Sequence, residues 1–135
     1  MKRDYDIWIA VVLVLLITVA TVAYDVNADN RVYAETDAEK VIEVRAGDSF
    51  YIKLEENPST GFTWHYTADN DDILILDSDQ FIPPKTEGLV GAPGAHEYKF
   101  LAFKTGETKV QFDYYQEWEP ENIDKTFVYN VKVKN

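Results

Sequence analysis

The sequence predicts an all-β fold, an immunoglobulin-like antiparallel β-sandwich preceded by an N-terminal hydrophobic signal or anchor helix. Three observations favour this fold. Apolar residues recur at every second position in short runs, turn residues bound these runs, and residues 31–135 contain no useful length of sequence with the 3.6-residue period of a helix. Of the 135 residues, 46% are hydrophobic and 14% are aromatic, which argues against disorder and provides one packed core.

The first 30 residues carry a hydrophobic segment, which we expect to be a signal peptide or a membrane anchor. Residues 7–23 are seventeen positions without a charge, a length between the apolar core of a signal peptide and a spanning helix of about 17 to 25 residues. Basic residues at 2–3 should hold the N-terminus in the cytoplasm. Small residues at 26–28 offer a cleavage site, so a cleaved signal peptide and an uncleaved membrane anchor both stay open. We therefore expect residues 1–30 to be leader and spacer. Residues 31–135 are then an extracytoplasmic domain, secreted or held at the membrane by the hydrophobic segment.

The first strands of the expected sandwich alternate apolar and polar residues around short turns. Ile42 and Val44 alternate with charged neighbours, residues 46–48 read Ala-Gly-Asp, and residues 50–54 resume the alternation. This pattern predicts a hairpin-like pair of half-buried strands. A further alternating strand, 62–66, follows the next loop.

The remaining strands follow the same rule, with one exception. Residues 73–76 form a continuous apolar run, and Pro83 and Pro84 end that segment because proline cannot donate to a β-ladder. After a loop rich in Gly and Pro, the alternation returns in three segments, 98–102, 110–114 and 127–133. Seven or eight short strands result, and two antiparallel sheets packed face to face are the simplest arrangement.

Composition excludes several classes of function. The 24 acidic residues outnumber the 13 basic ones and give a net charge of −11, which repels phosphate backbones, so we expect no nucleic acid partner. The chain has no cysteine, and therefore no disulfide framework, zinc–thiolate site or thiol nucleophile. Two lone histidines and acidic groups such as Asp71-Asp72 lack the spacing of a catalytic or calcium site and are better explained as structural or solvated. The sequence therefore predicts no enzyme, no metal and no cofactor.

Three loops differ from ordinary connections. Residues 57–61 read Asn-Pro-Ser-Thr-Gly, in which Asn can cap a turn, Pro fixes one φ and Gly permits a positive φ. Residues 91–94 read Gly-Ala-Pro-Gly, and residues 115–122 place Trp118 among polar and acidic neighbours, where an indole has little core to join. By these residues alone, each loop is either a plain connection or a preorganised binding loop. Trp118 is either an anchor for a partner or a side chain folded back on its own domain.

Three segments of the chain resemble the chagasin family, which are inhibitors of papain-like cysteine proteases. They read LEENPSTGFTWHY, FIPPKTEGLVGAPG and YYQEW and cover residues 54–66, 81–94 and 114–118. In that family an immunoglobulin-like sandwich presents three loops at one end, with an Asn-Pro-Thr-Thr-Gly, a Gly-x-Gly-Gly and an Arg-Pro-Trp motif. The resemblance implies that loops 57–61, 88–95 and 115–122 bind the protease.

The match is strongest in the first motif and weakest in the third. The protease-binding residues that the resemblance implies are Asn57, Pro58, Ser59, Thr60, Gly61, Gly91, Ala92, Pro93, Gly94, Gln116, Glu117 and Trp118. Ser59 replaces a threonine of the family and keeps its hydroxyl. Pro93 stands where a glycine is usual and removes a backbone donor, while Gln116 and Glu117 stand in place of the arginine and the proline. We expect these departures to change target range and strength, because a charged hydrogen bond is lost and Glu117 repels an acidic cleft rim.

The resemblance implies a reversible inhibitor that acts by blocking the active-site cleft, and the strand alternation and the absence of cysteine predict a monomer. Loop 57–61 would cover the catalytic Cys and His without offering a peptide bond for attack, Thr60 would supply hydrogen bonds there, and Trp118 would stack on the wall of the primed side. An extracytoplasmic immunoglobulin-like adhesion or scaffold module is the alternative, since fold does not imply function. That alternative predicts a plain first turn and an inward Trp118, so the test is whether the three loops lie together at one end.

Overall fold

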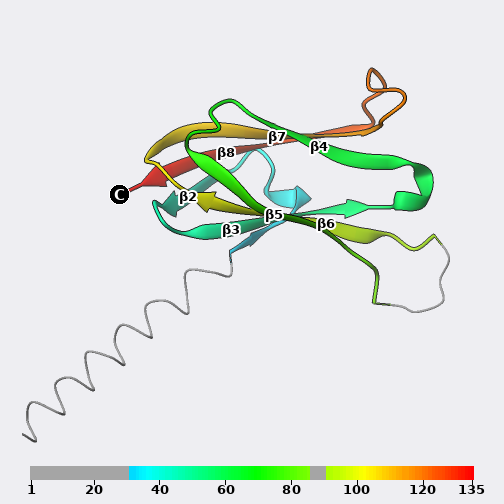
Figure 1. Cartoon of the computed structure of the whole chain (residues 1–135), viewed down its shortest axis with the longest axis horizontal. Coiled ribbons are helices and arrows are strands. Elements are labelled where there is room, and N and C mark those ends of the chain that lie inside the picture. Colours follow the sequence, from blue (N-terminus) through cyan, green and yellow to red (C-terminus); the bar gives the residue numbers. More distant parts are fainter. Residues whose placement is uncertain (1–30, 86–90) are drawn as a thin grey trace, which may run out of the picture. The chain divides into compact units, whose positions relative to one another are not determined.

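In the computed structural model, which describes residues 31–85 and 91–135, the chain forms eight strands and two short 3-10 turns (Figure 1). In chain order these are β1 (Val32–Tyr33), η1 (Glu35–Asp37), β2 (Val41–Arg45), β3 (Ser49–Glu56), η2 (Pro58–Thr60), β4 (Phe62–Ala68), β5 (Leu74–Ile82), β6 (Gly94–Ala102), β7 (Gly106–Gln116) and β8 (Lys125–Lys134). The alternating segments of the sequence all lie in strands. Residues 74–76 of the apolar run and the residues before Pro83 belong to one strand, β5, which has an irregularity between Leu76 and Ser78, while Ile73 lies in the turn before it.

The strands assemble into two four-stranded sheets, as the sequence predicts. One sheet has the order β1-β3-β6-β5 and the other β2-β8-β7-β4. The pairs β3–β6, β5–β6, β4–β7 and β7–β8 are antiparallel, whereas β1 is parallel to β3 and β2 is parallel to β8. The expectation of wholly antiparallel sheets is therefore wrong at these two pairs. The chain changes sheet between β1, β2 and β3, and a strand that arrives from the other sheet can join an edge in either direction.

The predicted hairpin between residues 42–45 and 50–54 is also wrong. Val44 of β2 lies opposite Val133, while Phe50 of β3 lies opposite Phe100 in the other sheet. The turn between them bonds to both sheets, because the backbone N–H of Ala46 donates to Lys134 and that of Gly47 donates to Ala102. Alternation shows which face of a strand is buried, but it is the same for strands that pair side by side and strands that face each other across a core.

The core fills the space between the two sheets and contains most of the apolar positions that the alternation selects. Its buried residues are Ile42, Val44, Phe50, Ile52, Leu54, Trp64, Ile73, Leu74, Tyr98, Phe100, Ala102, Val110, Phe112, Tyr114, Tyr129, Val131 and Val133. Aromatic rings dominate it: Phe50 stacks on Phe100 with ring centroids 5.6 Å apart, and Tyr98 packs on Phe112 at 4.9 Å. A close-packed core of this kind gives the loops a rigid frame.

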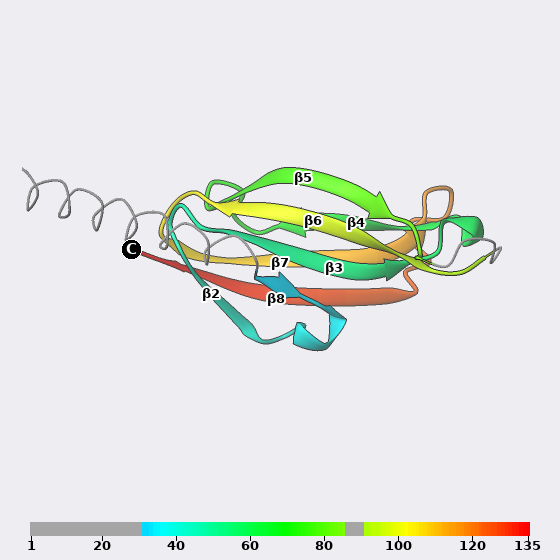
Figure 2. The same ribbon diagram turned by 90° about the horizontal axis from the view of Figure 1, so that it is seen from below.

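Three connections of the sandwich meet at one end. Figures 1 and 2 both place η2, the loop between β7 and β8 and the start of β6 at the end opposite the C-terminus. The predicted leader, residues 7–23, lies outside the described residues. Within the part of the chain that the structure describes, no helix is long and apolar enough to cross a membrane.

Candidate functional site

The first loop, 57–61, is a single 3-10 turn whose polar groups bond to one another. The Asn57 side-chain oxygen accepts hydrogen bonds from the Ser59 backbone N–H at 3.3 Å and from the Ser59 hydroxyl at 2.6 Å. The Thr60 hydroxyl donates to the Asn57 carbonyl at 2.7 Å and accepts from the Phe62 N–H at 3.3 Å. Pro58 occupies the first turn, where its missing N–H costs nothing. The predicted capping role of Asn57 is confirmed, and the turn is fixed before any partner binds.

The end of this turn is the point where the first and third loops touch. Gly61 has a φ of +79°, as the sequence predicts, and the indole of Trp118 lies against it. A Cβ at position 61 would lie 2.3 Å from Cη2 of Trp118, so any larger residue there would displace the indole. Trp118 still exposes 66% of its surface. An inward-packed tryptophan, which the adhesion-module alternative requires, is therefore contradicted.

Side-chain amides connect all three loops. The Asn57 amide nitrogen donates to the carbonyl of Gly91 in the second loop at 3.0 Å, and the Gln116 amide nitrogen donates to the carbonyl of Thr60 at 2.8 Å. The backbone N–H of Asn57 donates to the Tyr114 hydroxyl at 3.2 Å, which fixes the first loop to β7. The three loops thus form one continuous surface, which we call the loop edge: residues 57–61, 91–94 and 115–122.

The second loop, residues 91–94, forms the side of the loop edge that lies next to β5. Gly91 has a φ of +83° and Pro93 is exposed, while Ala92 is half-buried. Gly94 starts β6, where a Cβ would lie 2.4 Å from the carbonyl oxygen of Ile82, so this glycine serves close strand packing. Residues 88–90 of the predicted loop 88–95 lie outside the described residues.

The third loop is built from two successive turns. The Glu119 N–H donates to the Gln116 carbonyl at 2.9 Å, and the Asn122 N–H donates to the Glu119 carbonyl at 3.0 Å. Glu117, Glu119 and Glu121 are exposed. The loop therefore presents Trp118 on a compact, negatively charged support.

The polar groups of Thr60 bond within the free chain. Its hydroxyl, its N–H and its carbonyl have partners in the loop edge or next to it, through Asn57, Phe62 and Gln116. The hydroxyl group thus holds the turn in shape, and the hydrogen bonds to a peptidase that the resemblance implies for Thr60 stay a prediction.

Two contributions to the site do not follow from the sequence. From the sequence, Tyr114 is predicted only as a core residue of β7. The alternation shows that its side chain faces the core, but it does not show which group bonds to its hydroxyl. Gln116 reads as a weaker substitute for an arginine, whereas its neutral amide joins the third loop to the first. Both contacts depend on strand register, which places Phe62 opposite Gln116 and Trp64 opposite Tyr114.

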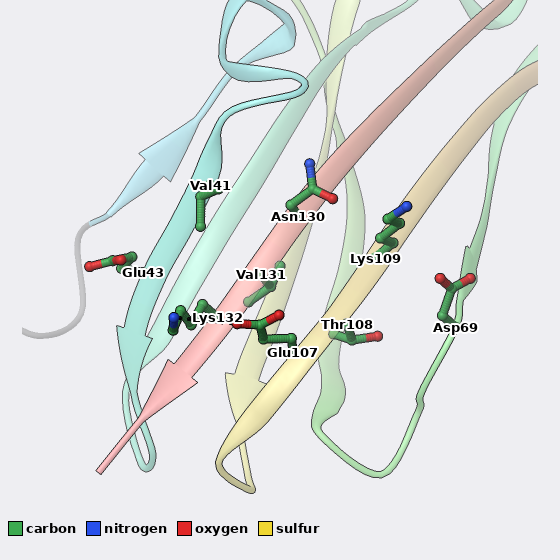
Figure 3. Close-up of a pocket in the computed structure, with 9 residues that line it drawn as sticks. All are labelled: Val41, Glu43, Asp69, Glu107, Thr108, Lys109, Asn130, Val131 and Lys132. Atoms are coloured by element: carbon green, nitrogen blue, oxygen red, sulfur yellow. Dashed lines mark ion pairs between the residues drawn. The ribbon is translucent and has the colours of Figure 1, made fainter.

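A hollow elsewhere on the domain has less specific chemistry. It has a volume of about 500 Å³ and opens on the outer face of β2, β7 and β8, and its lining carries charges of both signs (Figure 3). Lys132 and Glu107 form an ion pair there at 3.3 Å. Among residues 31–85 and 91–135, no three His, Asp or Glu side chains converge in a way that could hold a metal ion.

Three connected loops and an exposed tryptophan at one end of a rigid β-sandwich are features typical of a protein-binding module. Residues 43–133 match the family described as Chagasin family peptidase inhibitor I42, and the chain belongs to this family. It is therefore a peptidase inhibitor and not an enzyme, as the sequence predicts.

Individual relatives agree with this assignment over most of the domain. Amoebiasin-1 of Entamoeba histolytica is 28% identical over 100 residues, which are 74% of this chain and 96% of that protein. The crystal structure of the cysteine protease inhibitor EhICP2 from Entamoeba histolytica is 25% identical, with a TM-score of 0.71 over 78% of this chain and 96% of that one. The solution structure of amebosin is 25% identical, with a TM-score of 0.64 over 78% of this chain and 98% of that one.

Proposed function

We propose that the loop edge inhibits papain-like cysteine peptidases reversibly by filling the active-site cleft. The observation that carries this proposal is the set of contacts that join the loops: Asn57 to Gly91, Thr60 to Gln116, and Gly61 to Trp118. The description of EhICP2 as a cysteine protease inhibitor supports the class of peptidase.

Two properties of the first loop favour blockage over cleavage. Peptidases cut chains that reach the nucleophile in a near-attack geometry. Residues 58–60 form a closed 3-10 turn, held by hydrogen bonds from Thr60 and Gly61 to Asn57 and Pro58, so the loop does not present an extended peptide. Because these contacts exist in the free chain, little entropy is lost when the loop enters a cleft.

The direct test is a titration of papain with the purified chain. We expect loss of peptidase activity that returns on dilution, with the chain recovered uncut by mass spectrometry. The proposal would be contradicted if papain kept full activity at micromolar concentrations of the chain, or if papain cut the chain within residues 57–61.

The internal hydroxyl bonds of Thr60 lead to a prediction with a matched control. Thr60→Ala removes both bonds of the Oγ1 atom and loosens the turn, so we expect inhibition to weaken by about 0.5 to 1.5 kcal/mol, the usual value of one hydrogen bond. Thr60→Ser keeps the hydroxyl and should inhibit like the parent chain. Inhibition constants for the three proteins measure the effect, and equal weakening by both variants would show that the methyl group matters instead.

The acidic third loop should act on the rate of association. Glu119→Gln with Glu121→Gln should slow association with a peptidase whose cleft rim is positive by about 3- to 10-fold at low salt, and should leave dissociation nearly unchanged. Asp71→Asn with Asp72→Asn removes the same charge after β4, at the other end of the sandwich, and is the control. Stopped-flow rates at several salt concentrations measure the difference. A change confined to dissociation would show that the glutamates make close contacts.

We further propose that residues 31–135 are the monomeric inhibitor domain and that residues 7–23 export it or hold it at the membrane. The uncharged run and the basic residues before it support this proposal. Fractionation of the producing cell, with N-terminal sequencing of the exported chain, distinguishes a secreted form cleaved near 26–28 from an anchored one. An intact chain in the cytoplasm would contradict export.

A further inference from the structure

The roots of the first and second loops share a charged cluster that the inhibitory contacts do not use. His96 of β6 lies between two carboxylates, with Nδ1 against Glu56 of β3 and Nε2 against Asp79 of β5. Glu56 is the residue before Asn57, and β5 and β6 are the strands that flank the second loop. We call these three side chains the carboxylate–histidine bridge.

The bridge is shielded from solvent on the Glu56 side. Glu56 is 5% exposed, and its second oxygen accepts a hydrogen bond from the Thr63 hydroxyl of β4 at 2.8 Å. A buried carboxylate needs such partners because an unpaired charge in the interior is costly. Through Thr63 and His96, Glu56 therefore connects strands of both sheets at the base of the loop edge.

The other groups around the imidazole are defined. Tyr98 of β6 stacks on His96 with ring centroids 4.5 Å apart, and its hydroxyl donates to the Trp64 carbonyl. Burial, and next the charges of Asp79 and Glu56, raise the pKa of Tyr98 far above its ordinary value, so this phenol stays neutral. Lys53 of β3 and Glu97 of β6 are charged residues on the opposite face of the same sheet, and they form an ion pair with each other at 2.8 Å.

We propose that His96 is a positioning residue, which holds the roots of the first and second loops together most strongly when its imidazole is protonated. This inference rests on the proposed function, because it assigns a pH dependence to the same inhibitory edge. The identity of the peptidase does not enter it.

The direction of the pH effect follows from the donors of the ring. The imidazolium has two N–H groups and donates to both carboxylates, whereas neutral imidazole has one N–H and turns a lone pair toward the other carboxylate. The bridge is complete when the imidazole carries both protons, and it loses one hydrogen bond when His96 is deprotonated. Order in the loop edge, and inhibition, should both decrease as the pH rises.

The same geometry argues against a metal site. The two carboxylates lie at different nitrogens of one ring, so they do not converge with it on a shared point. The bridge is thus an internal contact of the protein.

The chain offers a matched pair of histidine variants for the test. His96→Gln replaces the ring with a neutral amide, which donates on one side only and does not titrate. His65→Gln changes the other histidine of the sequence, which stacks on Tyr115 with ring centroids 3.8 Å apart and has no carboxylate at its ring in the described structure. Asp79→Asn, at a side chain that is 47% exposed, weakens the bridge without disturbing the buried Glu56.

Two measurements on the full chain test the proposal between pH 5.5 and 8.5. Hydrogen exchange of peptides that contain residues 57–61 and 91–94 should be about tenfold faster in His96→Gln than in the parent chain at pH 5.5, and within about threefold at pH 8.5. The inhibition constants of His96→Gln and the parent chain for papain should converge in the same way as the pH rises, with Asp79→Asn intermediate. His65 stacks on Tyr115 of the loop edge, so the control is that the ratio of His65→Gln to the parent stays constant across the pH range. Comparison at each pH cancels the intrinsic pH dependence of exchange and of papain.

The outcomes separate the two proposals. A constant ratio of His96→Gln to the parent across the pH range, in exchange and in inhibition, overturns the role of His96. Parent chain that does not inhibit papain at any pH overturns the proposed function, while the exchange rates still decide whether the bridge orders the loops.

Discussion

Trp118→Ala should weaken inhibition by about 2 to 4 kcal/mol, or roughly 30- to 1000-fold, the range of aromatic residues that dominate interfaces. Trp118 exposes 66% of its surface in the free chain and lies at the point where the first and third loops meet. Its indole is a large rigid apolar surface on an otherwise acidic loop, and burial of that surface in a cleft is the main apolar gain available there.

The same substitution should leave folding stability nearly unchanged, because the ring contributes little to the core. Inhibition constants and thermal unfolding of the variant measure the two effects separately. Phe103→Ala is the control: Phe103 exposes 57% of its surface and follows β6 at the other end of the sandwich, so inhibition should not change. Equal inhibition by Trp118→Ala and the parent chain would exclude the tryptophan as an anchor.

The sequence predicts the strands well because each strand has one buried face. In β7, Val110, Phe112 and Tyr114 are buried and the residues between them are more exposed, which is the pattern that alternation describes. Pairing is a different matter. Whether β2 joins β3 or β8 depends on contacts between residues about ninety positions apart, such as Val44 with Val133, and alternation carries no information about them.

The candidate site shows the same division. The residue types of the first loop predict its turn, because the capping of Asn57 and the positive φ of Gly61 are local properties. The contacts that join the loops are not local: Asn57 reaches Gly91 and Gln116 reaches Thr60 across the loop edge. Motif matching therefore identifies the loops, whereas the structure explains why a departure such as Gln116 still supports the first loop.

The carboxylate–histidine bridge also could not be predicted from the sequence. Glu56, Asp79 and His96 are isolated polar residues in three strands, and no spacing rule connects them. Only the order β3-β6-β5 brings them into one row. A histidine that reads as structural thus becomes the candidate for control of the loops.

Gly61→Ala should have an effect on inhibition as large as that of Trp118→Ala, with about 100-fold or greater loss. A positive φ costs an alanine about 1 to 2 kcal/mol, and the new Cβ would lie 2.3 Å from Cη2 of Trp118, so the indole must leave its place. The turn and the tryptophan anchor are then disturbed together, whereas the core is untouched.

Gly47→Ala separates the backbone cost from the contact with Trp118. Gly47 has a φ of +95°, a Cβ added there would meet nothing within 4 Å, and the residue follows β2 at the end of the sandwich away from the loop edge. Both glycine variants should lose about 1 to 2 kcal/mol of unfolding free energy, but only Gly61→Ala should lose inhibition. A double-mutant cycle tests the contact between Gly61 and Trp118 directly. In a chain that already carries Trp118→Ala, Gly61→Ala should reduce inhibition by a smaller factor than it does in the parent chain, because the indole that clashes with the new Cβ is absent. Additive effects of the two substitutions on inhibition would show that Gly61 acts through the backbone of the first loop and not through the tryptophan.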